Sequence, residues 1–229
     1  MGEMIEFERP DGGKVPGYYA AKDESAPGVV VIQEWWGLID EIKSVADRLS
    51  NAGFRALVPD LFRGRKAAKG DEANHLLEGL DFQDALQQDV RGALLYLKKN
   101  GAKAGVLGYC MGGALALLAA MHLPEDDASV VFYGFPPAEA GDPSEIRIPL
   151  QLHFGTEDEF FKPERAREIE SKLKAGGVDH EFHWYEGAHH GFCNPNQPGN
   201  SGLGNYDAQA AAAAWQRAVD FLTRTLSRR

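Results

Sequence analysis

The sequence Gly108-Tyr109-Cys110-Met111-Gly112-Gly113 follows a short apolar run at 104–107 and opens an apolar, small-residue segment at 112–120. A predicted strand that turns into a predicted helix around G-x-C-x-G is the context of a nucleophile elbow, here with cysteine in the serine position. Glycines are required two residues before and after Cys110 because so tight a turn leaves no room for side chains. The alternative is a buried cysteine in a turn that only needs close packing.

Strand-like and helix-like segments alternate on both sides of this turn. A β-branched run at 29–32 and a strand-like run at 54–58 enclose a segment with helical periodicity from Ile39 to Leu49, which together predict a βαβ unit. Further strands are predicted at 104–107, 129–133, 150–154 and 180–185, and further helices at 82–99, 112–120, 163–175 and 208–226. We therefore predict an α/β fold with a mostly parallel sheet of about eight strands flanked by helices.

The remaining segments are consistent with one folded unit. Residues 5–7 and 18–20 are predicted to begin the sheet as antiparallel strands, whereas 63–78 and 194–206 are predicted to be irregular. No Ser/Gly linker, repeat or block of charge divides the chain. We therefore predict that residues 1–229 form a single domain.

Composition narrows the classes of function. The chain has 24 Lys and Arg against 34 Asp and Glu, a net charge of −10, which disfavours binding to nucleic-acid phosphates. No apolar run approaches the roughly 20 residues of a bilayer-spanning helix, and the first residues do not form a secretory signal. Two cysteines, Cys110 and Cys193, are too few for a disulfide framework. We expect a cytoplasmic protein that binds neither nucleic acid nor membranes.

Candidate partners for a cysteine nucleophile follow two later predicted strands. Gly155-Thr156-Glu157-Asp158-Glu159 comes after the strand at 150–154, and Glu186-Gly187-Ala188-His189-His190 comes after the strand at 180–185. A nucleophile needs a base, and the base needs an orienting group. The order nucleophile, acid, histidine is that of α/β-hydrolases. Three strand ends in this order favour a catalytic site over a chance arrangement.

These motifs resemble those of the dienelactone hydrolase family of the α/β-hydrolase superfamily. The resemblance covers most of the chain, from Val29 to the C-terminal helix. Its motifs are Gln33-Glu34-Trp35-Trp36-Gly37, Val58-Pro59-Asp60-Leu61, the turn around Cys110, His153-Phe154-Gly155 with Asp158 and Pro163, and residues 185–192. The G-x-C-x-G turn together with the Gln-Glu pair is specific to this family within the superfamily.

The resemblance implies a role for each matched residue. It implies a catalytic triad of Cys110, His190 and Asp158, because the family histidine is followed by a small residue and then Phe, and the family acid aligns on the Gly155 turn. It also implies that Glu34 lies beside the thiol and modulates it, and that Trp35 and Met111 donate backbone N–H groups to an oxyanion. For Glu34, a helix-capping carboxylate is the alternative.

Other residues are assigned more loosely. Trp36, Tyr109, Phe192 and Asn194 are candidate substrate-pocket residues, and of the pair Trp35 and Trp36 we expect one to line the pocket and one to pack in the core. Cys193, Glu157 and Glu159 are expected to have no catalytic part, and the sequence leaves open whether His189 has a role. The basic cluster Arg63, Arg65, Lys66 and Lys69 is interpreted as a solvated loop, although it could also steer an anionic substrate.

The family comparison also shows a gap. Dienelactone-opening members hold the substrate carboxylate with two arginines, one of which lies four residues after the catalytic histidine; here that position is Asn194, and no arginine follows Arg65 before the helix at 82–99. A neutral or larger ester, or a lactone, is therefore as plausible a substrate as a dienelactone. The sequence predicts a cysteine-dependent hydrolase of small-molecule esters or lactones, acting through a thioester on Cys110 without cofactor or metal.

One alternative and one open point remain. The alternative is a non-catalytic or thiol-sensing α/β-hydrolase-like protein that binds a small molecule, which would keep the fold and lose a triad residue. The sequence leaves undecided whether the protein is a monomer or a homodimer.

Overall fold

The structure is a computed structural model that describes residues 1–196 and 206–227. At its centre lies an eight-stranded sheet in the order β1-β2-β4-β3-β5-β6-β7-β8. The strands are β1 (Glu3–Glu8), β2 (Lys14–Ala20), β3 (Gly28–Ile32), β4 (Arg55–Pro59), β5 (Ala104–Tyr109), β6 (Ser129–Phe132), β7 (Leu150–Gly155) and β8 (His180–Tyr185). β2 pairs antiparallel with both β1 and β4, whereas all strands from β3 to β8 are parallel to one another, which confirms the predicted mostly parallel sheet.

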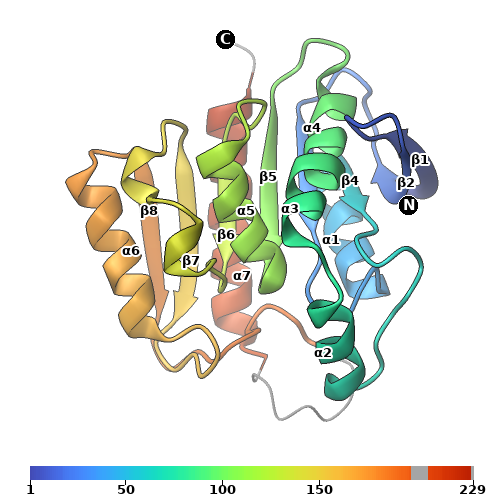
Figure 1. Cartoon of the computed structure of the whole chain (residues 1–229). Coiled ribbons are helices and arrows are strands. Elements are labelled where there is room, and N and C mark those ends of the chain that lie inside the picture. Colours follow the sequence, from blue (N-terminus) through green and yellow to red (C-terminus); the bar gives the residue numbers. More distant parts are fainter. Residues whose placement is uncertain (197–205, 228–229) are drawn as a thin grey trace.

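Helices cover both faces of the sheet (Figure 1). The helices are α1 (Asp40–Asn51), α2 (Gly70–Glu78), α3 (Phe82–Asp84), α4 (Arg91–Lys98), α5 (Met111–His122), α6 (Pro163–Ala175) and α7 (Ala208–Leu226), with a π-helical segment η1 (Ala85–Val90) and two 3-10 turns, η2 (Ala138–Ala140) and η3 (Pro143–Glu145). α1 and α7 pack on one face, whereas α4, α5 and α6 pack on the other. This three-layer arrangement is the α/β-hydrolase fold that the sequence predicts.

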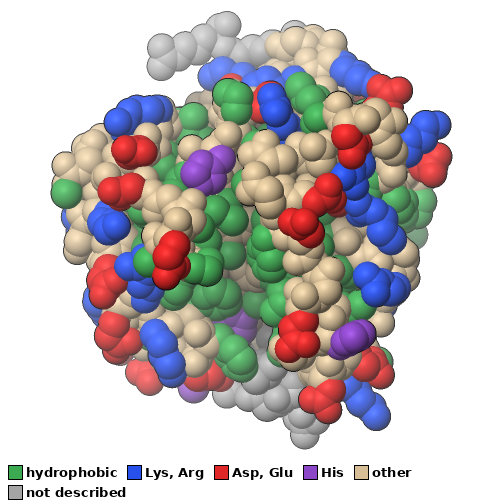
Figure 2. Space-filling model, in the orientation of Figure 1, with side chains coloured by type: hydrophobic (Ala, Val, Ile, Leu, Met, Phe, Trp, Pro, Cys, Tyr) green, Lys and Arg blue, Asp and Glu red, His purple; other side chains and the backbone are tan. Residues whose placement is uncertain are grey.

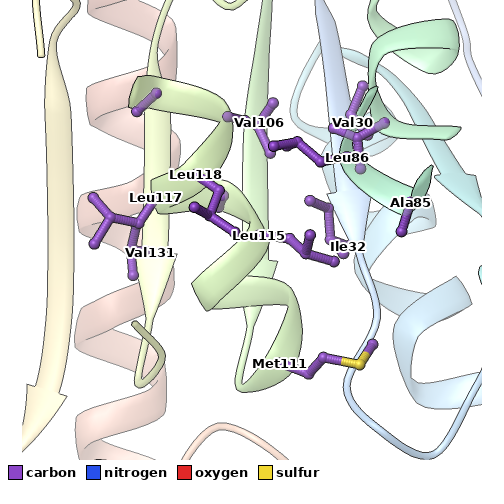
Figure 3. Packing of buried hydrophobic residues seen from close by; sticks show 14 of the residues in the cluster. Val30, Ile32, Ala85, Leu86, Val106, Met111, Leu115, Leu117, Leu118 and Val131 are labelled. Carbon is purple, nitrogen blue, oxygen red and sulfur yellow. The ribbon is translucent and has the colours of Figure 1, made fainter. Parts of the chain in front are cut away.

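The central strands are apolar along their whole length because both of their faces are covered. β3, β4 and β5 are buried throughout, as expected for parallel strands between two helical layers. α5 is the most deeply buried helix, and its residues from Met111 to Ala120 are all buried. In Figure 3, Leu115 of α5 lies beside Ile32 of β3, and Leu117 lies beside Val131 of β6. The small residues of α5 therefore reflect a helix that packs against the sheet with almost no exposed side.

The order in which strands are added to the sheet reverses between β3 and β5, which are themselves parallel. β3 pairs with β4 on one side and with β5 on the other, so the connections that leave these two strands diverge. The crevice outside the carboxyl ends of two such strands is the usual ligand site of an open α/β sheet. Glu34 follows β3 and Cys110 follows β5, so both lie at this crevice.

Two stretches differ from the sequence prediction. Residues 63–78, predicted to be irregular, contain α2, in which Ala73 and Leu76 are buried at the helical spacing of three. The helix predicted over 82–99 is helical throughout but passes through the π segment η1 between α3 and α4. The predicted loop at 194–206 falls largely on 197–205, outside the described residues. No helix in the described part of the chain is long and apolar enough to cross a membrane.

Candidate active site

The turn after β5 holds Cys110 in a conformation that non-glycine residues rarely adopt. Its φ is 55° and its ψ is −118°, directly before the first residue of α5. The N–H of Cys110 donates to Phe132 O at 3.0 Å, which ties the turn to β6. A Cβ on Gly108 would lie 1.9 Å from Gly112 O, and one on Gly112 would lie 2.4 Å from Ile32 O. The glycines at these two positions are therefore a steric requirement of the turn, as the sequence predicts.

Three strand ends bring Cys110, His190 and Asp158 into one hydrogen-bonded chain. His190 Nε2 lies 3.2 Å from Cys110 Sγ, and His190 Nδ1 lies 3.0 Å from Asp158 Oδ2. His190 and Asp158 are buried, whereas Cys110 is partly exposed. Cys110 is thus the most exposed residue of the three, and His190 lines the same cavity.

The acid is held by its own loop. Asp158 Oδ1 accepts hydrogen bonds from the N–H groups of Phe160 at 2.9 Å and Phe161 at 2.8 Å, which leaves Oδ2 directed at His190. Glu159 turns the other way. Its Oε2 lies 3.4 Å from His189 Nδ1 and accepts from the N–H of His190 at 3.4 Å. Glu159 therefore anchors the two-histidine turn, a role that sequence reasoning missed.

The electrostatics of His190 depend on its two partners. Burial alone would lower the pKa of His190, but the Cys110 sulfur and the Asp158 carboxylate outweigh burial and raise this pKa well above its ordinary value. A protonated imidazole is stabilised only if its neighbours carry negative charge. The arrangement therefore favours a proton on His190 when the sulfur is a thiolate.

Glu34 is buried next to this chain but is held by two other side chains. Asn194 Nδ2 donates to Glu34 Oε2 at 2.6 Å, and the Tyr133 hydroxyl donates to Oε1 at 3.3 Å. Burial raises the pKa of Glu34, although Asn194, His190 and Tyr133 partly oppose the rise. The carboxylate lines the same cavity as Cys110, but its hydrogen bonds go to Asn194 and Tyr133 rather than to the thiol. This is not the side-chain cap of a helix that the alternative interpretation supposed.

Met111, which directly follows Cys110, and Trp35, which directly follows Glu34, carry the two backbone N–H groups that the sequence predicts to receive an oxyanion. Met111 is the first residue of α5, so its N–H is among the donors that a helix N-terminus leaves unpaired. Trp35 follows Glu34 at the end of β3, and within the described residues no backbone carbonyl accepts from its N–H. The N-terminus of α5 adds the positive end of the helix dipole at this point.

A cavity of about 660 Å³ opens at Cys110 and His190. Figure 2 shows the hollow in the middle of this face of the molecule, with hydrophobic side chains gathered in it. Trp35 and Trp36 both line the cavity, and Trp36 is at the same time almost fully buried in the hydrophobic core, whereas Trp35 is partly exposed. Within the described residues the wall contains no lysine or arginine.

The other candidate pocket residues lie elsewhere. Tyr109 and Asn194 line a second cavity of about 550 Å³, together with Cys193. Phe192 lines neither cavity; it is fully buried and packs on Tyr133, with ring centroids 5.3 Å apart. Its prediction as a pocket residue is wrong because its ring packs in the core between Tyr133 and Tyr185, with a centroid distance of 4.9 Å to Tyr185.

The basic cluster after β4 does not reach the cavity. Arg63 makes an ion pair with the buried Asp89 at 2.8 Å and donates to Asp60 O, and Arg65 donates to Phe62 O at 3.2 Å. These arginines brace their own loop. Neither is among the residues that line the cavity at Cys110.

Sequence reasoning missed Tyr133, Phe160 and Phe161. Tyr133 has a φ of 37°, is fully buried, and packs edge-on against His190 with ring centroids 5.2 Å apart. Phe160 and Phe161 pack against the same imidazole at 5.2 and 5.5 Å. No local motif marks these residues. The sequence marks them only by position: Tyr133 directly follows β6, and Phe160 and Phe161 follow the acid Asp158 within three residues.

The fold and the arrangement of the three strand ends define the α/β-hydrolase class. Within it, the family model of the dienelactone hydrolase family matches residues 15–226, so the chain belongs to that family. A protein named usf from Aquifex pyrophilus is 34% identical, covering 99% of this chain and 100% of its own. A carboxymethylenebutenolidase from Rhodococcus opacus is 27% identical over 95% of this chain and 89% of its own.

Solved structures agree with this assignment. The crystal structure of a dienelactone hydrolase-like promiscuous phosphotriesterase from metagenomic libraries matches with a TM-score of 0.84 and 26% identity, covering 99% of both chains. The chain is a hydrolase of a family that acts on carboxylic esters and lactones.

Proposed function

We propose that this protein hydrolyses a small-molecule carboxylic ester or lactone through a thioester on Cys110, with His190 as base and Asp158 as the acid that orients it. The observation that carries the proposal is the continuous chain of contacts from Asp158 through His190 to the cysteine sulfur at the mouth of a cavity. Nucleophile, base and orienting acid in hydrogen-bond reach of one another are the signature of nucleophilic catalysis.

The first half-reaction forms the acyl-enzyme. The thiol proton passes to His190 Nε2 as Sγ attacks the carbonyl carbon, and the carbonyl oxygen becomes an oxyanion. The N–H groups of Met111 and Trp35 receive this oxyanion, an interaction worth a few kcal/mol per donor. When the intermediate collapses, the bond from carbon to the leaving oxygen breaks and His190 returns its proton to that oxygen. An alcohol leaves, or the opened end of a lactone.

The second half-reaction restores the enzyme. Water attacks the thioester carbon, its proton goes to His190, and the same two N–H groups hold the new oxyanion. The carbon–sulfur bond then breaks, the carboxylic acid departs, and the proton on His190 returns to sulfur. Asp158 keeps its negative charge throughout and fixes the imidazole tautomer, since Oδ2 faces Nδ1 and Oδ1 is occupied by the loop.

Glu34 acts as a modulator of the thiol. A buried carboxylate near Cys110 disfavours a second negative charge on sulfur, which would keep the idle cysteine less prone to oxidation. Asn194 and Tyr133 fix the carboxylate at that position. Asn194 occupies the place at which dienelactone-opening members carry an arginine, and here its amide is engaged by Glu34. We therefore infer a neutral substrate rather than a dienelactone carboxylate.

The proposal is tested with p-nitrophenyl acetate and a panel of neutral lactones. Cys110→Ala should lower kcat/KM by at least about a thousandfold, because an alanine offers no nucleophile. Cys110→Ser should retain at most a small fraction of the wild-type rate. Cys193→Ala is the matched control and should keep the wild-type rate. Full activity in Cys110→Ala would reject the proposal.

A further inference from the structure

One wall of the active-site cavity is a single stripe of α5. The residues of this helix that line the cavity are Met111, Ala114, Leu118 and His122. Their spacings of three and four place them on one face of the helix. Met111 and His122 are three turns apart, about 16 Å along the axis at 1.5 Å per residue. The cavity therefore extends from the sulfur along most of the length of α5.

The facing walls of this extension are also apolar. Phe82 of α3 and Leu86 of η1 line it, and Phe135, which follows β6, lines the cavity where it packs on Phe161 with ring centroids 5.0 Å apart. η1, which follows α3, packs against α5, and Figure 2 shows a hollow on this face of the molecule with hydrophobic side chains gathered in it. At its far end His122 is exposed, and its Nε2 lies 2.8 Å from Ala140 O. The space next to Ala114 and Leu118 is long and lined mainly by apolar side chains, and no lysine or arginine of the described residues lines it.

The position of His190 determines on which side of Cys110 the leaving group of a bound ester lies and on which side its acyl group lies. The base must reach the leaving oxygen to protonate it, so the leaving group lies on the side of the imidazole. Phe160 and Phe161 pack against the imidazole and line that side. Since the leaving group occupies the side next to Phe160 and Phe161, the acyl group extends in the other direction, along Ala114 and Leu118.

We propose that the α5 side of the cavity is an acyl-chain channel, and that the substrate class is a neutral ester with an unbranched, medium-length apolar acyl chain. This inference rests on the proposed acyl transfer to Cys110. An extended chain advances roughly 1.2 Å per bond, as a polypeptide backbone does. Leu118, two turns from Met111, would then contact an acyl chain at about its eighth carbon. Leu118 is the residue that sets the preferred chain length.

The test is kcat/KM for p-nitrophenyl esters from acetate to decanoate, each below its solubility limit. In the wild type, kcat/KM should rise by up to about threefold per methylene as far as octanoate, because each buried CH₂ adds binding energy that the transition state retains. A constant leaving group throughout the series ensures that only the acyl side varies. A profile that is flat or falling beyond acetate would reject the channel.

Substitution of Leu118 tests the position of the channel. Leu118→Trp should lower the octanoate-to-acetate ratio of kcat/KM by at least tenfold, whereas Leu118→Ala should move the optimum to a longer chain. Leu95→Trp is the matched control, because Leu95 is exposed on α4 and does not line the cavity; it should leave the ratio unchanged. If Leu118→Trp fails to fold, Leu118→Ala and the wild-type profile decide. An unchanged optimum in Leu118→Ala would overturn the assignment.

Two further measurements separate this inference from the proposed function. If acetate hydrolysis needs Cys110 but acyl length has no effect, the channel is rejected and the acyl transfer stands. If acetate hydrolysis is unchanged in Cys110→Ala, the proposed function itself fails. A series of acetate esters with lengthening alcohols should show a weaker length dependence than the acyl series; a stronger one would place the chain on the leaving-group side.

Discussion

Cys110 and Cys193 share a residue type, partial exposure and a position after a strand, yet their surroundings differ. Cys110 has a left-handed backbone, a histidine at 3.2 Å and the N-terminus of α5 beside it. Cys193 lines the other cavity, and burial together with Glu34 raises its thiol pKa well above the ordinary value. Glu34 lines both cavities and so lies between the two sulfurs.

This difference shows that a reactive position is made by neighbouring strand ends rather than by the cysteine itself. Cys193 is only three residues from His190 in the sequence, but within the described residues its side-chain hydrogen bond is with Tyr133 rather than with a histidine. Cys110 is 80 residues away from His190 in the sequence and contacts it directly. The predictions that follow separate the two environments, beginning with the largest expected effect.

The largest difference in activity is expected between variants of the two adjacent histidines. His190→Ala should reduce kcat/KM for p-nitrophenyl acetate by at least about a thousandfold, because it removes the proton acceptor at Sγ. His189→Ala is the matched control. Its side chain is exposed and paired with Glu159, so the expected loss is less than about tenfold. Equal losses, or a larger loss at His189, would contradict the assignment of the base.

The next largest difference in activity is expected between variants of neighbouring acids in the sequence 157–159. Asp158→Asn should lower kcat by about a hundredfold or more, since an amide favours the wrong tautomer of His190. Glu157→Gln, which changes the neighbouring acid in the same way, should leave kcat within about twofold. Steady-state kinetics of the two variants decides the point, and a wild-type kcat in Asp158→Asn would show that the acid is elsewhere.

Glu34 is expected to have a smaller effect on the reactivity of Cys110. In a Cys193→Ala background, iodoacetamide should alkylate Cys110 several times faster in Glu34→Gln than in the parent. The physical reason is that removal of a nearby negative charge favours the thiolate, which is the form that reacts. Second-order labelling rates measured by intact mass provide the test. An unchanged or slower rate would count against a modulating role for Glu34.

The smallest effect on activity is expected from substitution of Asp126, a buried carboxylate at the opposite end of the sheet from Cys110. Burial raises its pKa to about 7 from 3.8, although hydrogen bonds from Ser129 and the N–H of Ala128 partly oppose the rise. Between these two pKa values the folded state binds the proton more tightly than the unfolded chain does. The free energy of unfolding should therefore fall as pH rises from about 4 to 7.

Asp126→Asn should remove this dependence. The difference in unfolding free energy between the variant and the wild type should shift by a few kcal/mol in favour of the variant from pH 4 to pH 8. Urea titrations at several pH values measure it, and kcat/KM should stay within about twofold of wild type. Parallel pH profiles of stability for the two proteins would show that Asp126 does not titrate as described.

Much of the fold could be predicted because its signals are local. The β-branched run of β3, the glycines around Cys110 and the helical periodicity of α1 each report their own conformation. α2 was missed because its short apolar pattern is set among charged and small residues. The π turn η1 leaves no mark in the sequence, since its residues suit an ordinary helix equally well.

The site could be predicted only in part, for a related reason. Cys110, Asp158 and His190 follow strands in a fixed order, and their type and spacing are visible along the chain. The side chains that surround them depend on how distant loops meet. Phe192 was placed in the pocket from its motif, but it packs in the core, while Tyr133 and Phe161 reach the imidazole from loops without a motif.

The central claim is that the acyl group passes through Cys110, and trapping that intermediate tests it most directly. The protein is mixed with p-nitrophenyl acetate, quenched in acid within milliseconds to seconds, and examined by intact and peptide mass spectrometry. We predict one added acetyl group, located on the peptide that contains Cys110, and no acetyl group at that position in Cys110→Ala. An acetyl group on the Cys193 peptide instead, or turnover with no acyl group on Cys110 at any time, would contradict the account.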